Sequence, residues 1–166
     1  MKPSGFTLFE LLITLSVLSI TLSIAVPQMR GVIDRSDLAA TSQQFLAAVN
    51  HARSEAIKRN AFVVMRAAGN WEQGWVTFED RNQNAEQDPG ETVLLVHTKQ
   101  SNLQIQGNGV MTRYIGYGGS GRSRQTSGAF LAGTLKICNK NATSKIVINA
   151  GGRARLNKEA SNTCTP

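Results

Sequence analysis

The chain has 166 residues, of which 41% are hydrophobic and 17% charged, and its formal net charge is +7. This length leaves room for one domain beyond a membrane segment and excludes a second large domain in this chain. The charge is uneven, because residues 1–91 carry eight Lys and Arg against ten Asp and Glu, whereas residues 92–166 carry ten against one. The basic half indicates an anionic partner, although solubility would explain the same charge.

The amino-terminal segment is apolar. From Phe6 to Val26 the only charged residue is Glu10, and about 20 apolar residues match the thickness of a bilayer. A secretory signal peptide has a shorter apolar core that is followed by its cleavage site, whereas here the small residue Gly5 precedes the run. We therefore expect residues 6–27 to form a membrane-spanning helix, with the rest of the chain in an oxidising compartment.

The string Gly5-Phe6-Thr7-Leu8-Phe9-Glu10 resembles the class III leader of type IV prepilins and type II secretion pseudopilins. The resemblance implies that a prepilin peptidase removes residues 1–5 after Gly5 and that Phe6 is methylated. It also implies that Glu10 meets the Phe6 amine of a neighbouring subunit, since either charge alone is costly in lipid. The alternative is an ordinary signal anchor that tolerates one Glu.

Residues 28–60 have the period of an amphipathic helix. Their apolar side chains recur at helical spacing and predict one stripe that docks on a globular head, formed by Leu38, Phe45, Val49, Ala52 and Ala56. We expect this helix to continue the spanning helix, with a kink or local melting near Pro27 and Gly31.

Beyond residue 60 the period becomes that of short strands separated by clusters of Gly, Asn, Asp and Ser. The expected strands are residues 61–68, 75–78, 92–98, 103–106, 113–117, 129–138 and 145–149. Because no helical pattern lies between them, these strands should pair in antiparallel sheets. The sequence therefore predicts an α+β fold, with a long helix packed on a β-rich head of residues 61–166.

Three segments of this head resemble the head domain that FimT and FimU minor pilins share with the secretion pseudopilin GspH, namely residues 74–78 running into residues 80–91, residues 134–138 and residues 151–155. The resemblance covers most of the chain. It implies a fibre-forming subunit without enzyme activity or cofactor, whose partners are other pilins. Such a subunit is held in the inner membrane with a periplasmic head before it enters the pilus fibre.

A Gly-Arg-x-Arg element follows the last expected strand and is repeated once earlier in the chain. In the FimT branch such an element binds DNA during natural transformation, and Gly152, Arg153 and Arg155 match it position by position. Alternate arginines of an extended segment share a face, and their guanidinium groups suit phosphate oxygens. Turn and strand geometry would explain the same short string. The candidate DNA contacts are Gly152, Arg153, Arg155, Lys158, Arg122 and Arg124.

Two further sites follow from the sequence. Cys138 and Cys164 should form a disulfide that ties down the carboxy-terminal tail, and free thiols or metal ligands are less favoured because there is no CxxC motif. The loop from residue 80 to residue 91 has the alternating oxygen side chains of a calcium loop, but Ala85 replaces the turn glycine. We favour a plain polar loop over a cation site formed by Asp80, Asn82, Asn84, Asp88 and Glu91.

Three functions fit these features. The favoured one is a minor pilin that binds DNA without sequence specificity for natural transformation. The alternatives are a structural minor pilin that primes pilus assembly and a type II secretion pseudopilin. No constellation of residues points to catalysis.

Overall fold

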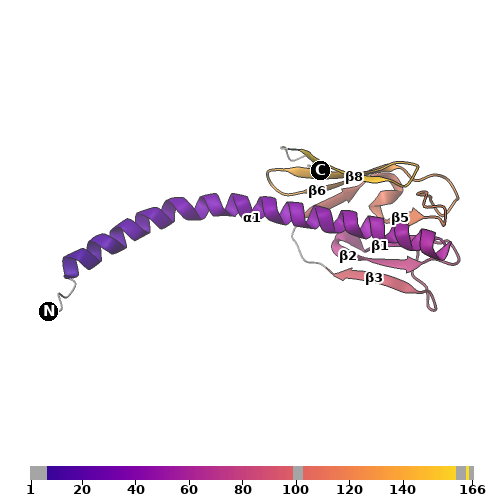
Figure 1. Cartoon of the computed structure of the whole chain (residues 1–166), viewed down its shortest axis with the longest axis horizontal. Helices are drawn as coiled ribbons and strands as arrows, with labels where there is room; N and C mark the ends of the chain where they lie inside the picture. Colours follow the sequence, from indigo (N-terminus) through magenta and orange to yellow (C-terminus); the bar gives the residue numbers. More distant parts are fainter. Residues whose placement is uncertain (1–6, 99–102, 160–163, 165–166) are drawn as a thin grey trace. The chain divides into compact units, whose positions relative to one another are not determined.

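The computed structural model describes residues 7–98, 103–159 and 164 (Figure 1). The chain divides into two compact units, Met1–Ser36 and Asp37–Pro166, and the first helix contributes to both. In chain order the elements are α1 (Leu8–Arg59), β1 (Val63–Ala68), β2 (Asn70–Glu79), β3 (Val93–Thr98), β4 (Gln104–Gly107), the 3-10 turn η1 (Gly109–Thr112), β5 (Tyr114–Tyr117), β6 (Gly133–Cys138), β7 (Thr143–Ile148) and β8 (Ala154–Glu159).

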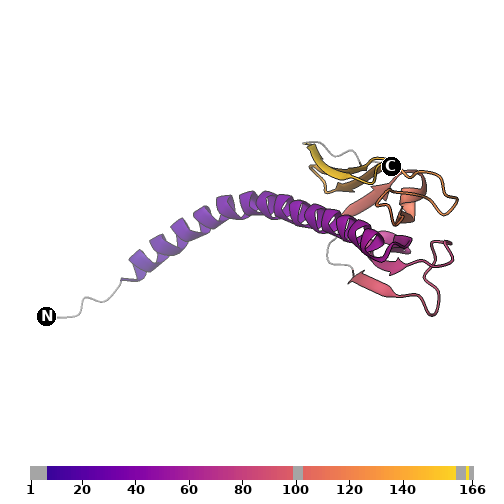
Figure 2. The ribbon, with the colours of Figure 1, turned by 45° about the vertical axis from the view of Figure 1, so that its right-hand side comes forward.

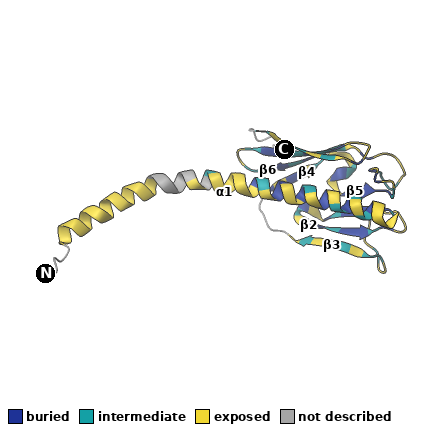
Figure 3. Ribbon diagram, in the orientation of Figure 1, coloured by how far each residue is buried: buried dark blue, intermediate teal, exposed yellow. Residues whose placement is uncertain are grey.

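The first part of α1 exposes apolar side chains all around the helix (Figure 3). These exposed residues include Leu8, Phe9, Leu12, Leu15, Leu18 and Leu22. Within the residues that the structure describes, no helix is both long enough and apolar enough to cross a bilayer. The membrane span expected at residues 6–27 therefore stays a prediction.

The helix is continuous through Pro27 and Gly31, so the local melting expected there was wrong, while the expected kink stays a prediction. A proline removes one backbone donor and crowds the preceding turn. Ending a helix and starting another leaves up to four unsatisfied groups at each new terminus. Keeping the helix therefore costs fewer hydrogen bonds than breaking it.

The predicted stripe of α1 forms one side of the core of the second unit. Phe45, Val49, Ala52 and Ala56 are fully buried, and Leu38 is nearly so. The ring centroid of Phe45 lies 5.2 Å from that of Trp71 and 4.9 Å from that of Trp75, edge-on in both pairs. Edge-to-face pairs stabilise by about 1 kcal/mol beyond their buried area, so these contacts fix the position of the helix on the head.

Two antiparallel sheets of four strands complete this unit. The first has the strand order β3-β2-β1-β5 and the second β4-β6-β7-β8. Figures 1 and 2 show the end of α1 between them, with β3 on one side and β8 on the other. The antiparallel α+β architecture predicted from the sequence is confirmed.

All seven expected strands are present, with shifted bounds, and β8 is an eighth that we did not expect. Its sequence, Ala-Arg-Leu-Asn-Lys-Glu, contains few residues that favour strands. Only Ala154 and Leu156 alternate as half-buried apolar residues. The strand forms because β7 supplies a full antiparallel partner from Thr143 to Ile148.

Candidate functional site

A reciprocal cap closes the amino-terminal end of α1. Oε2 of Glu10 accepts hydrogen bonds from the backbone N–H of Thr7 at 3.0 Å and from its hydroxyl at 2.9 Å. The N–H of Glu10 donates to Oγ1 of Thr7 at 3.3 Å. We missed this capping box in the sequence, although Thr-x-x-Glu is its signature. Glu10 thus fixes where the helix begins.

The second carboxylate oxygen of Glu10 accepts no hydrogen bond from the residues that the structure describes. The cap therefore leaves Oε1 available for a partner outside the helix. Gly5 and Phe6 lie outside the described residues, so the processing site and the pairing of Glu10 with a neighbour's amine stay predictions.

The hydroxyl groups in the apolar part of α1 are satisfied by the helix itself. They donate to carbonyl oxygens three or four residues earlier, at 2.7–3.0 Å, and belong to Thr14, Ser16, Ser19, Thr21 and Ser23. A hydroxyl bonded in this way needs no water. This part of α1 is therefore suited to apolar surroundings, whether lipid or other helices.

The two Gly-Arg-x-Arg elements meet in the head, although they lie far apart in the sequence. Gly152 is buried and has a φ of +82°, and a side-chain carbon there would lie 2.2 Å from the carbonyl oxygen of Gly121. The hydroxyl of Ser123 donates to the carbonyl oxygen of Asn149 at 2.9 Å. The turns before the two arginine pairs are therefore in direct backbone contact.

Arg53 on α1 holds both turns in place. Its Nε donates to the carbonyl oxygen of Gly121 at 2.9 Å, and its Nη2 donates to that of Gly151 at 3.5 Å. The sequence carried no signal for this role, because the contacts span 68 and 98 residues.

Replacing Gly152 by Ala should lower the free energy of unfolding by about 2–4 kcal/mol, because the left-handed φ strains any other residue and the new methyl group meets the Gly121 carbonyl. Gly151→Ala is the matched control. A side-chain carbon at Gly151 meets only Oδ1 of Asn149, at 3.4 Å. Urea unfolding of both variants checks the prediction, and equal stabilities would show that the two turns do not touch.

Three arginines of the two elements are exposed, namely Arg122, Arg153 and Arg155. The backbone of Arg153 is fixed by Asn149, whose Oδ1 accepts from the Arg153 N–H at 3.0 Å. Ala154 between the arginines is half-buried. This alternation places Arg153 and Arg155 on one side of the extended chain.

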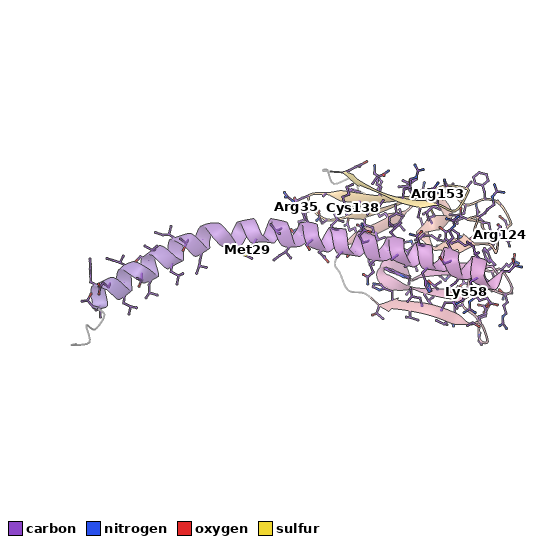
Figure 4. All side chains as sticks on the ribbon, viewed as in Figure 1. Met29, Arg35, Lys58, Arg124, Cys138 and Arg153 are labelled. Carbon is purple, nitrogen blue, oxygen red and sulfur yellow. A yellow bond between two sulfur atoms is a disulfide. The ribbon has the colours of Figure 1, made fainter. Side chains whose placement is uncertain are left out.

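Arg124 differs from the other three arginines. Its guanidinium carbon lies 4.7 Å from the centroid of the Phe62 ring, and its Nη2 donates to Oε1 of Gln83. A cation–π contact and a hydrogen bond together hold this side chain against the head. Figure 4 labels it and Arg153 at separate places on the head. The Arg124 side chain is therefore held against the head, and its contact with DNA stays a prediction.

Lys158 also departs from the expected group. It pairs in register with Ser144, which is buried, whereas Arg155 pairs with the half-buried Val147. Neighbouring positions of a strand face opposite ways, so Lys158 and Arg155 lie on opposite faces of β8. The face that carries Arg155 also carries Lys145, whose Nζ lies 2.5 Å from Oε1 of Glu159.

The predicted disulfide between Cys138 and Cys164 is confirmed, with Cα atoms 6.0 Å apart. Both half-cystines are 1% exposed. The bridge attaches the end of the chain to β6, two strands away from β8 in the second sheet.

We expect Cys138→Ser to lower the free energy of unfolding by roughly 3 kcal/mol, chiefly because the unbridged chain gains entropy when it unfolds. Chemical unfolding of the oxidised parent and of the variant measures this difference. Mass analysis of the protein from the periplasm that finds two free thiols in the parent would contradict the bridge.

The polar loop after β2 is held by its own side chains. Asp80 is 1% exposed, and its carboxylate accepts from the backbone N–H of Asn84 at 3.2 Å and of Ala85 at 2.8 Å. Oδ2 of Asp88 accepts from the side-chain amides of Asn82 at 2.8 Å and Asn84 at 2.7 Å. The oxygens that a cation would require are therefore engaged within the loop.

Glu91 closes this loop in the same way, since its carboxylate accepts from the N–H of Arg81 at 2.9 Å and of Asp88 at 3.1 Å. Burial raises the pKa of Asp80 above its ordinary value, and the hydrogen bonds from the backbone oppose that rise. Among residues 7–98, 103–159 and 164, no three His, Cys, Asp or Glu side chains group as metal ligands. The structure thus supports a polar loop at this place.

Comparisons with known proteins agree with these features. The family model described as type II transport protein GspH matches residues 41–152, and the prokaryotic N-terminal methylation motif matches residues 1–26. The pilin-like protein PilA1 of Thermus thermophilus is 32% identical over 161 residues, which are 94% of this chain and 99% of that protein.

Two crystal structures of the type IV minor pilin FimU from Pseudomonas aeruginosa are similar to the chain. Their TM-scores are 0.61 and 0.58 at 17% identity, and the alignments cover 77% and 74% of this chain and 96% and 98% of FimU. At that identity the likeness concerns the fold alone. The fold and the family are structural rather than enzymatic. Because the GspH model matches more than half of the chain and PilA1 aligns over nearly all of it, the chain belongs to the GspH family of pilin-like proteins.

Proposed function

We propose that the subunit is cleaved after Gly5, methylated on Phe6 and held in the inner membrane with a periplasmic head before it enters a pilus. The match to the methylation motif supports the processing. The exposed apolar side chains from Leu8 to Leu22 and the free Oε1 of Glu10 support assembly through α1. Partners of this helix are other pilins, and the enzyme that cleaves the leader is a prepilin peptidase.

We further propose that the head binds DNA without sequence specificity and that this binding serves natural transformation. The observation that carries this proposal is the contact of Gly152 with Gly121, which brings the exposed Arg153 and Arg155 to the element that carries the exposed Arg122. Guanidinium groups bind phosphate oxygens by paired hydrogen bonds.

The charge around these arginines supports the same proposal. Residues 92–166 contain one acid, Glu159, and its carboxylate is paired with Lys145. Within residues 92–166 the one carboxylate side chain is therefore already paired with a lysine. Contacts through phosphates position DNA but carry no sequence information. A gel-shift experiment with the full chain in detergent tests the proposal, and two unrelated duplexes should shift equally.

The match to the GspH model favours one alternative, a pseudopilin of a type II secretion system. The fold shared with FimU favours another, a minor pilin that primes assembly without binding DNA. Deleting the gene separates the three functions. Loss of transformation with pili intact supports DNA capture, loss of pili supports priming, and loss of secretion alone supports the pseudopilin.

A further inference from the structure

A hollow of about 360 Å³ lies beside the Arg122 element. Residues between Ser120 and Phe130 form most of its wall, and Ala150 forms the rest. Ala150 lies two residues before Gly152, in the turn that carries the second arginine pair. The hollow is therefore shared by the two elements that we assign to DNA binding.

Phe130 is the most exposed large apolar side chain among the described residues of the second unit, at 69%. Its backbone is well anchored. Phe130 pairs with Arg124 in an antiparallel bridge, and the N–H of Leu131 donates to the carbonyl oxygen of Ser123 at 3.1 Å. The neighbouring Leu131 is fully buried. An aromatic ring is thus presented to solvent from a hairpin that is itself held in the core.

The hairpin also places arginine residues beside the Phe130 ring. Residues that pair across an antiparallel bridge share a face, so Phe130 lies beside Arg124. Arg122 lines the same hollow as these two residues. Arg122 is exposed. The hollow therefore offers a flat apolar surface next to a free guanidinium group.

A flat apolar group joined to a phosphate matches this arrangement. We propose that the hollow binds an unstacked base of single-stranded DNA, with Phe130 stacked on the base and Arg122 on an adjacent phosphate. Bases of a single strand have free faces, whereas those of a duplex are covered by their neighbours, so Phe130 selects for the single strand. This inference rests on the proposed DNA binding and specifies the form of DNA that the site prefers.

The test compares Phe130→Ala with the parent, as full chains in detergent, by fluorescence anisotropy. The probes are a labelled single-stranded oligothymidylate and a blunt duplex of equal length. Phe130→Ala should weaken binding of the single strand by about tenfold, as the loss of one stacked base does, and leave duplex binding within about twofold. Phe130→Tyr should restore the parent affinity.

Val96→Ala is the matched control, because Val96 is an apolar side chain on β3 with 63% exposure. It should change neither affinity. Unchanged single-strand binding by Phe130→Ala would overturn the inference, as would an equal loss on both probes. If the variant binds the single strand normally but is missing from sheared pili, Phe130 is a subunit contact and the inference is again overturned. A parent that binds neither probe would contradict the proposed function itself, and the inference with it.

Discussion

Glu10→Ala should leave a cleaved, membrane-inserted subunit that enters pili poorly. The reason is that the amine of the neighbouring subunit loses its carboxylate, and breaking one partner of a buried ion pair costs about 3–5 kcal/mol. A loss of that size predicts a more than tenfold fall of the subunit in sheared pili. Immunoblots of the pilus and membrane fractions measure it, with Gly5→Ser as the variant that blocks cleavage itself.

Glu10→Gln separates the two roles of this side chain. Gln can serve in a capping box and so keeps the hydrogen bonds to Thr7, but it carries no charge. We expect Glu10→Gln to enter pili as poorly as Glu10→Ala. If Glu10→Gln subunits reach normal levels in pili, assembly depends on the helix cap and not on the ion pair.

The double change Arg153→Gln and Arg155→Gln should weaken DNA binding of every sequence, because both side chains are exposed and contact phosphates in the proposed complex. The slope of log K against log salt should become shallower by about two units. Substitutions of exposed residues change the free energy of unfolding by less than about 0.5 kcal/mol each, so the melting temperature should stay unchanged. Cells with the double variant should lose transformation and keep their pili.

A control with the same loss of charge makes this test specific. Arg113 and Lys140 belong to the basic half and are exposed, and neither belongs to the two arginine elements. Arg113→Gln with Lys140→Gln should leave the slope almost unchanged. Equal weakening by both double variants would mean that overall charge, and not the arginine pair, accounts for binding.

Local periodicity explains what the sequence predicted well. The stripe from Leu38 to Ala56 follows the helical period, and seven strands follow from alternation and turn residues, because both patterns depend on near neighbours. β8 was missed because its residues do not favour a strand, and its formation depends on β7. The local melting expected near Pro27 was wrong because a local rule for proline ignores the cost of two new helix ends.

Local sequence patterns also failed to predict how the residues of the candidate site come together. The arginine strings were visible in the sequence, but the contact between Gly121 and Gly152 spans 31 residues and depends on how the sheets pack. The same long-range packing places Arg124 on Phe62 and turns Lys158 away from Arg155. Phe130 gave no signal, since a single Phe inside the expected strand of residues 129–138 reads as a core residue until its exposure is known.

The salt dependence of DNA binding by the full chain tests the central claim most directly. Fluorescence anisotropy with a labelled duplex, at salt concentrations between roughly 50 and 200 mM, gives the number of phosphate contacts. Three exposed arginines predict a slope of about −3 in log K against log salt, equal for unrelated sequences. A slope near zero, or no binding at the lowest salt, would contradict the account and leave the head as a structural part of the pilus.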